Sequence, residues 1–197
     1  MKIIGLTGNS GTGKSTVAKI FSENFGYIID ADFIAHENMK RGNVAYNELV
    51  QNFGKEILSD DKEINRKKLG EIVFSDKNKL DLLNQISLKY ILLEISNKVE
   101  KTVKNPSGFK YIVIDAPLLI ETGLNKITDE VWVVFASYET RIDRITKRDN
   151  ISAELAEKRL ANQTPQSELI TYADVVIEND GIELPDLSKI VLENLNL

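Results

Sequence analysis

Residues 8–15 have the types and spacing of a loop that binds polyphosphate: Gly8, Asn9, Ser10, Gly11, Thr12, Gly13, Lys14 and Ser15. Glycines let the backbone turn its N–H groups inward around an anion. An apolar run at 3–7 precedes the loop and a helical pattern follows to Asn24, so a helix N-terminus adds partial positive charge. In such a loop the lysine reaches the β- and γ-phosphates and the hydroxyl after it binds Mg²⁺. The stretch predicts a site for a nucleoside triphosphate.

Carboxylates end two of the expected strands. Asp30 and Asp32 follow an apolar stretch at 27–30, and Asp115 ends another at 110–115. Ligands of parallel α/β sheets lie beyond the carboxyl ends of the strands, the edge that also carries the phosphate loop. We therefore expect Asp30 and Asp32 to face the γ-phosphate and its metal, and Asp115 to hold Mg²⁺ directly or through water. The alternatives are a helix N-cap for the first pair and a turn residue for Asp115.

Composition restricts the classes of function. The chain has 197 residues, a net charge of −5 and no cysteine. The charge argues against nucleic acid or an anionic membrane as the main partner, and disulfides and thiolate metal sites are excluded. We find no apolar run of membrane-spanning length and no signal-peptide pattern, so we expect a cytoplasmic protein. A single histidine, His36, excludes His-based metal clusters and Ser-His-Asp triads.

The order of the expected elements indicates the fold. Apolar stretches at 3–7, 27–30, 110–115, 129–136 and 174–177 predict five strands, separated by helical patterns that include a short helix at 116–121 and a last helix at 184–195. This alternation predicts an α/β fold with a five-stranded, parallel, doubly wound sheet. Between Ile34 and Asn105 we expect only helices, over 43–52, after Asn65 and after Asp76. That insertion is either a thick packing layer or a substrate-binding arm, and its place directly after Asp32 favours the arm.

A second charged segment follows the fourth strand. Residues 138–163 have two helical patterns that separate at Asp149-Asn150, and the second begins at Ser152. Charged helix pairs are commonly solvated surface. Because this pair follows a strand that ends near the phosphates, we favour a mobile lid whose arginines cover them and exclude water.

Several stretches together resemble the dephospho-coenzyme A kinase family over nearly the whole chain. They are residues 5–16, the acidic motif 30–36, Phe53-Gly54, residues 65–69, Phe74, Leu83-Asn84, the turn 117–121, Arg144, Arg148-Asp149, Gln163, Ala173-Asp174, and Asn179 with Gly181. The chain departs from the family pattern at Ser87-Leu88, where His-Pro is usual, and at residues 41–43.

The resemblance implies a P-loop kinase fold in which different segments of the chain have different functions. It implies one kinase domain with a core of 1–31, 107–137 and 166–197, a helical acceptor-binding arm of 32–106, and a helical lid of 138–165. It implies transfer of a phosphoryl group from ATP·Mg²⁺ to the ribose 3′-hydroxyl of dephospho-coenzyme A, by a monomer or small homo-oligomer.

The resemblance also implies roles for individual residues. Asp32, Lys14 and Arg148 carry the catalysis; the nucleotide is held by residues 8–15 with Thr16, Arg144 and Asn179; the acceptor is held by Asp32, His36, Arg66, Leu69, Pro117 and Leu118; the metal lies at Ser15, Asp30 and Asp115. Two other classes remain open: a P-loop kinase for a nucleoside or a monophosphate, and a nucleotide sensor that does not catalyse. A regulatory GTPase is disfavoured, because Asn125-Lys126-Ile127-Thr128 lacks the aspartate of the guanine motif.

Overall fold

A computed structural model describes residues 1–195. The chain forms two compact units, one of Met1–Ile29 with the chain from Thr102 onward, the other of Asp30–Lys101. The last two residues of the predicted core segment 166–197 lie outside the described residues. No helix within 1–195 is long and apolar enough to cross a membrane.

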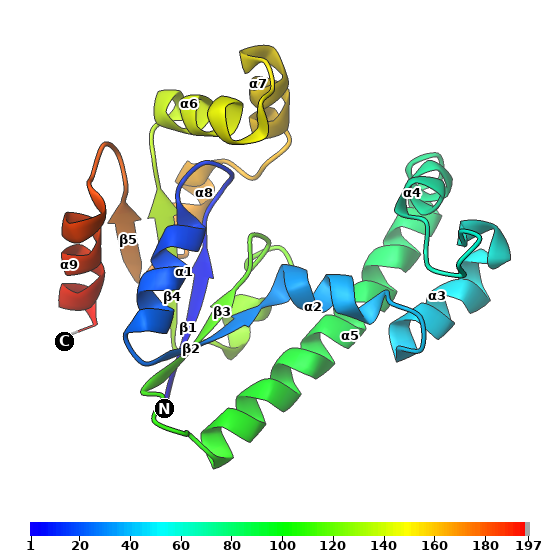
Figure 1. Ribbon diagram of the computed structural model, residues 1–197, viewed down its shortest axis with the longest axis horizontal. Helices are drawn as coiled ribbons and strands as arrows, with labels where there is room; N and C mark the ends of the chain where they lie inside the picture. Colours follow the sequence, from blue (N-terminus) through cyan, green and yellow to red (C-terminus); the bar gives the residue numbers. More distant parts are fainter. Residues whose placement is uncertain (196–197) are drawn as a thin grey trace. The chain divides into compact units, whose positions relative to one another are not determined.

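The first unit is built on a five-stranded sheet (Figure 1). Its strands are β1 (Lys2–Thr7), β2 (Gly26–Asp30), β3 (Tyr111–Asp115), β4 (Glu130–Phe135) and β5 (Val175–Glu178), in the spatial order β2-β3-β1-β4-β5. The central strand β1 pairs in parallel with β3 and β4, Leu6 lying opposite Asp115 and Trp132. The predicted α/β fold with its parallel five-stranded sheet is confirmed.

Two helices cover one face of this sheet. They are α1 (Lys14–Glu23) and α9 (Leu184–Asn194), and their apolar side chains pack into one core with alternate residues of the strands. Phe21 of α1 meets Trp132 of β4 edge to face, with ring centroids 5.1 Å apart. Both rings are fully buried, so this contact holds the last turn of α1, the helix that follows the phosphate loop, against the middle of the sheet.

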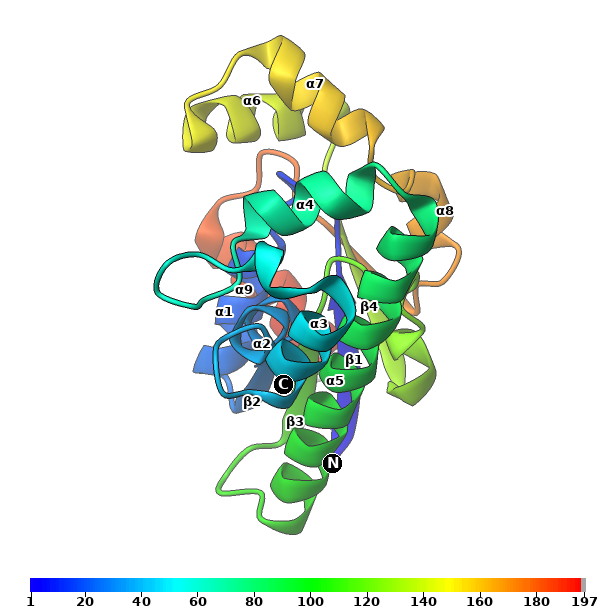
Figure 2. The same cartoon turned by 90° about the vertical axis from the view of Figure 1, so that its right-hand side faces the viewer.

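The charged segment after β4 forms a helical hairpin at the carboxyl edge of the sheet, as both views show (Figures 1 and 2). Its helices are α6 (Tyr138–Asp149) and α7 (Ala153–Ala161). The hydroxyls of Ser137 and Ser152 accept hydrogen bonds from the first turns of α6 and α7, and Asn150 ends α6 in the left-handed conformation with φ 51°. The predicted break and the Ser152 cap are confirmed.

The unit Asp30–Lys101 is helical. It contains α2 (Ala31–Asn38), α3 (Val44–Phe53), the 3₁₀ turn η1 (Lys55–Ile57), α4 (Arg66–Phe74) and most of α5 (Lys77–Lys104), around their own apolar core. The Asn65 side chain accepts from the N–H groups of Lys67 and Lys68, which starts α4 where the sequence predicts it. Helix α5 runs unbroken through Ser87-Leu88, since without a proline no backbone hydrogen bond is removed there.

One expectation about local structure was wrong, and one short helix was missed. Residues 116–121 form turns, followed by the 3₁₀ turn η2 (Leu124–Ile127), where the pattern predicted a short helix. The Thr122 N–H bonds the Leu118 carbonyl in a single helical turn, but the next N–H, that of the left-handed Gly123 with φ 74°, bonds the Ile120 carbonyl and ends it. The five-residue helix α8 (Gln166–Ile170) was not predicted, because so short a helix shows no periodicity.

Candidate active site

The loop between β1 and α1 is shaped by glycines that no other residue could replace. Gly13 has φ +89°, and a Cβ there would lie 2.2 Å from Nδ2 of Asn179. Gly11 has φ +83°, and its Cβ would lie 2.8 Å from the carbonyl oxygen of Arg141. Only glycine accommodates both the left-handed backbone and these approaches. The loop is therefore closely packed against the segments after β4 and β5.

Hydrogen bonds from distant parts of the chain hold the same loop. Asn179, at the end of β5 and 4% exposed, donates from Nδ2 to the Thr12 carbonyl at 2.8 Å. Arg144 donates from NH1 to the carbonyls of Gly11 and Thr12 at 3.2 and 3.3 Å, and from NH2 to that of Asn179 at 2.9 Å. These donors occupy loop carbonyls. Of the loop N–H groups, those of Ser10 and Thr12 bond Gln163 and Asn9, so an anion would bind at the other loop N–H groups.

Arg141, a buried residue of α6 in the hairpin, also supports the loop. It is almost completely buried, and its Nε donates to the Ser10 carbonyl at 3.0 Å. Its NH2 donates to Oε1 of Gln163 at 3.1 Å, and this oxygen also accepts the Ser10 N–H at 3.2 Å. Burial lowers the pKa of the Arg141 guanidinium from its usual value. The hydrogen bonds account for a charged group at this depth.

A pocket of about 680 Å³ opens over the loop and contains four cationic side chains. Its lining is Gly8, Asn9, Ser10, Gly11, Gly13, Lys14, Ser15, Pro117, Arg144, Lys147, Arg148 and Gln163. Four positive charges, glycine amides and a helix N-terminus suit a polyphosphate. The pocket matches the chemistry that the loop predicts.

Lys14 and Asp115 form an ion pair between the start of α1 and the end of β3, and both side chains are largely buried. Within residues 1–195 no three His, Asp or Glu side chains gather as a metal cluster. Mg²⁺ commonly takes one or two protein oxygens and completes its shell with phosphates and water. The Ser15 hydroxyl lines the pocket and the Asp115 carboxylate lies at the end of β3. These two oxygen donors match the coordination preference of Mg²⁺.

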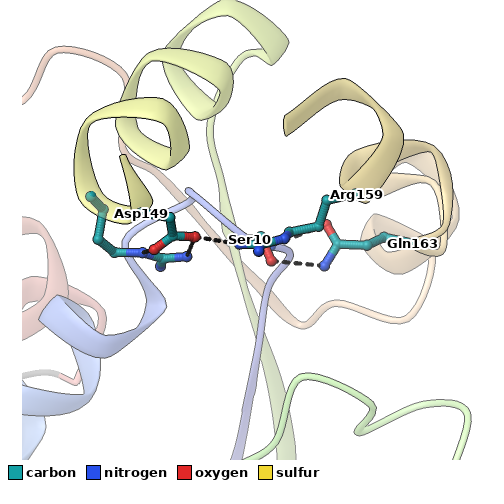
Figure 3. A network of polar contacts seen from close by, with 5 residues as sticks. Ser10, Asp149, Arg159 and Gln163 are labelled. Carbon is teal, nitrogen blue, oxygen red and sulfur yellow. Dashed lines mark hydrogen bonds and ion pairs between the residues drawn. The ribbon is translucent and has the colours of Figure 1, made fainter. Parts of the chain in front are cut away.

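The end of α6 carries a second charged group. The Asp149 carboxylate accepts two hydrogen bonds from Arg148 and contacts Arg159 of α7 (Figure 3). The hydrogen bonds from Arg148, and next those from Arg159, hold the pKa of Asp149 well below its usual value. Arg148 lines the pocket, so this cluster places a cation beside the loop.

The helical unit has a pocket of its own, of about 570 Å³. Its lining is Asp32, Ala35, His36, Met39, Arg66, Leu69, Gly70, Val73, Phe74, Leu80, Leu83 and Asn84. The charged groups come from α2 and the start of α4, where Arg66 contacts the imidazole of His36, and the polar Asn84 comes from α5. The rest is largely apolar, and Phe74 is 81% exposed. This composition suits a ligand with anionic and apolar parts.

Comparison with known proteins agrees with this geometry. The model of the dephospho-coenzyme A kinase family matches residues 2–184. The chain belongs to that family. A dephospho-CoA kinase of Carboxydothermus hydrogenoformans is 42% identical over 181 residues, which are 92% of this chain and 87% of that protein.

Solved structures give the same result. The crystal structure of TT1252 from Thermus thermophilus aligns with a TM-score of 0.82 and 28% identity, covering 99% of this chain and 96% of that one. A dephospho-CoA kinase from Campylobacter jejuni aligns with a TM-score of 0.72 and 28% identity, covering 100% and 96%. The chain is thus a kinase with an alcohol acceptor, and use of ATP follows from the family.

The structure brings most of the predicted site residues into one pocket or the other. Lys14, Ser15, Arg144 and Arg148 share the phosphate pocket with the loop, while Asp32, His36, Arg66 and Leu69 line the pocket of the helical unit. Their individual roles stay predictions.

Other predicted residues lie elsewhere. Thr12, within the loop, and Asn179, which packs against it, are buried. Thr16 lies in α1 with its N–H bonded to the Gly13 carbonyl at 2.9 Å. Pro117, expected to touch the acceptor, lines the phosphate pocket, and Leu118 lines neither pocket. Asp30 caps α2 by accepting the Phe33 N–H at 2.8 Å and also lines neither, so the capping alternative describes its contact.

Sequence reasoning missed several residues that support the site. Arg141 lies within the charged segment 138–163 and was given no role of its own, and Gln163 entered only as part of a resemblance. A signal for Arg141 was present, because Arg141, Arg144 and Arg148 are spaced three and four apart and so share one face of α6. Nothing local marks Gln163, whose partner Ser10 is 153 residues away.

Proposed function

We propose that this chain transfers the γ-phosphoryl group of ATP to the ribose 3′-hydroxyl of dephospho-coenzyme A, giving ADP and coenzyme A, the last step of coenzyme A biosynthesis. Family membership supports the reaction. The observation that carries it in the structure is the pocket in which Lys14, Arg144, Lys147 and Arg148 gather over the glycine loop. We assign the helical segment 32–106 to the acceptor and the segment 138–165 to the lid.

On the nucleotide side, the loop amides and Lys14 bind the β- and γ-phosphates. The Ser15 hydroxyl and the Asp115 carboxylate would hold Mg²⁺, which would supply positive charge that offsets the charge developing on the phosphates. Arg148 offsets the charge that builds on the oxygens of the transferred group. Arg144, already bonded to three carbonyls, holds the loop in the conformation that binds phosphate.

On the acceptor side, Asp32 orients the 3′-hydroxyl and accepts its proton as the new O–P bond forms and the bond to the β-phosphate oxygen breaks. The proton then passes to solvent and ADP leaves. Because the transition state is loose, the base acts late and orientation is its larger contribution. Arg66 and His36 suit the acceptor's diphosphate, and the apolar side of the pocket, with Leu69, suits its pantetheine chain.

The test is ADP release measured with and without dephospho-coenzyme A. We expect release to depend on the acceptor and Asp32→Asn to lower kcat by about 10²- to 10⁴-fold, since it keeps the size of the side chain but cannot take a proton. Glu37→Gln is the matched control, because Glu37 is a carboxylate on the same helix outside the pocket. Full activity in Asp32→Asn would refute the assigned base. Release with another nucleoside or monophosphate alone would favour a different P-loop kinase, and no release with any acceptor would favour a sensor.

A further inference from the structure

Two arginines from different helices of the lid segment share one carboxylate. Asp149, the last residue of α6, accepts from Nε of Arg148 at 2.7 Å on Oδ1 and from NH2 of Arg148 at 3.0 Å on Oδ2. Its Oδ2 also contacts NH1 of Arg159, which reaches across from α7 (Figure 3). The bidentate bond fixes the plane of the Arg148 guanidinium relative to the end of α6.

The carboxylate is the most enclosed member of this cluster. The side chain of Asp149 is 24% exposed, against 60% for Arg148 and 46% for Arg159. A guanidinium has five N–H donors, and Asp149 engages two of those on Arg148. Asp149 does not use the other N–H donors of Arg148, and Arg148 lines the pocket over the phosphate loop, so these donors can bond a phosphate there.

Helix α7 is itself attached to the phosphate loop. Gln163, just after α7, donates from Nε2 to the Ser10 hydroxyl at 3.0 Å and accepts the Ser10 N–H at 3.2 Å (Figure 3). Arg159 lies in α7, four residues before Gln163. The loop therefore fixes α7 through Gln163, and α7 fixes Asp149 through Arg159.

We propose that Asp149, held from α7 by Arg159, is a positioning residue that orients the Arg148 guanidinium toward the γ-phosphate of ATP. This inference rests on the proposed function, in which Arg148 acts on the transferred group. An arginine side chain has many rotamers, and displacement of a catalytic group by about 1 Å can lower the rate about 10²-fold. Holding the guanidinium in one orientation before ATP binds therefore raises the rate of transfer. Exposed ion pairs contribute little to stability, so the effect of Asp149 is expected in catalysis rather than in folding.

The first experiment compares Asp149→Asn and Asp149→Glu with the wild type, and uses Glu154→Gln, which breaks an exposed Lys158 ion pair on α7, as the matched control. We expect Asp149→Asn to lower kcat by about 10- to 100-fold with the KM for the acceptor and the thermal midpoint nearly unchanged. Asp149→Glu should restore part of the rate, and Glu154→Gln should match the wild type. An unchanged kcat in Asp149→Asn would overturn the inference, since the cluster would then be an ordinary surface ion pair. An increased kcat would also overturn it, since Asp149 would then keep Arg148 away from the phosphate.

A double-mutant comparison separates positioning from an independent effect. If Asp149 acts only through Arg148, then Arg148→Ala and the double variant Arg148→Ala/Asp149→Asn have the same kcat. If the two losses multiply, the inference is overturned.

A binding measurement needs neither acceptor nor turnover. Calorimetry with ADP and with a non-hydrolysable ATP analogue should show that Asp149→Asn weakens the analogue about three- to tenfold, by loosening one charge-assisted contact, and leaves ADP unchanged. Equal affinities for wild type and variant with both nucleotides would contradict the inference. A wild type that binds the analogue but makes no coenzyme A would instead contradict the proposed function and leave this result standing.

Discussion

Replacing Asn179 by alanine tests how the phosphate loop is held. The Asn179 amide is buried behind the loop and donates to the Thr12 carbonyl at 2.8 Å. In Asn179→Ala this carbonyl, on a fully buried residue, keeps only the longer of its two side-chain hydrogen bonds, that from Arg144 at 3.3 Å. Loss of a buried hydrogen bond costs about 0.5–1.5 kcal/mol, and more where an acceptor is left poorly satisfied. We expect the free energy of unfolding to fall by about 1–2 kcal/mol, and the thermal midpoint by roughly 2–8 °C for a chain of this size.

The same loss should appear in nucleotide binding, because the loosened loop must be ordered again when the phosphates bind. A cost of about 1–2 kcal/mol corresponds to a Kd for ADP raised about 5- to 30-fold. Isothermal calorimetry gives the Kd and thermal unfolding gives the midpoint. Glu178→Ala, at the exposed neighbouring position, is the matched control and should change neither. A lowered midpoint with a Kd within twofold of the wild type would refute the reasoning, since Asn179 would then support the core and not the loop.

Two further predictions concern Lys14 and Asp180. Lys14→Ala should lower kcat by orders of magnitude without unfolding the chain, because we propose that Lys14 binds the β- and γ-phosphates. Lys19→Ala, on the exposed side of α1, is the control and should be neutral, and normal turnover in Lys14→Ala would remove the nucleotide assignment. Hydrogen bonds from the Thr140 hydroxyl, and then from Ser137, lower the pKa of Asp180 in the folded chain. Above the unfolded pKa of about 3.9, the ionised carboxylate therefore stabilises the fold. This contribution is lost as the pH falls through the folded pKa. The urea midpoint of Asp180→Asn should therefore lie below that of the wild type at pH 7, and the difference should shrink below about pH 4; a difference independent of pH would exclude the ionised carboxylate as its cause.

The sequence predicts the sheet and the loop well because their signals are local. Each strand is a short apolar run, and the Gly11, Gly13 and Lys14 positions of the loop are set by spacing within eight residues. Caps at Asn65 and Ser152 are equally local, since each side chain bonds N–H groups two or three residues away. Elements too short for periodicity, such as 116–121 and α8, are where the prediction failed.

The support of the loop could not be predicted in the same way. Arg141 and Gln163 reach Ser10 across 131 and 153 residues, and both bond its backbone groups, which carry no residue-type signal. Asp30 shows the opposite case, in which one residue type satisfies two hypotheses. An aspartate at a strand end suits both a metal and a helix cap, and only the Phe33 hydrogen bond shows which contact it makes. Spacing identifies the groups that do chemistry, while folding determines which groups hold them.

The measurement that bears most directly on the central claim is the identity of the product. Purified protein is incubated with ATP, Mg²⁺ and saturating dephospho-coenzyme A, and the product is analysed by mass and by phosphorus NMR. We predict a mass gain of one phosphoryl group and a new phosphomonoester on the ribose 3′-oxygen, formed in step with ADP. A phosphoryl group at any other position, or ADP formed without a phosphorylated acceptor, would contradict the account.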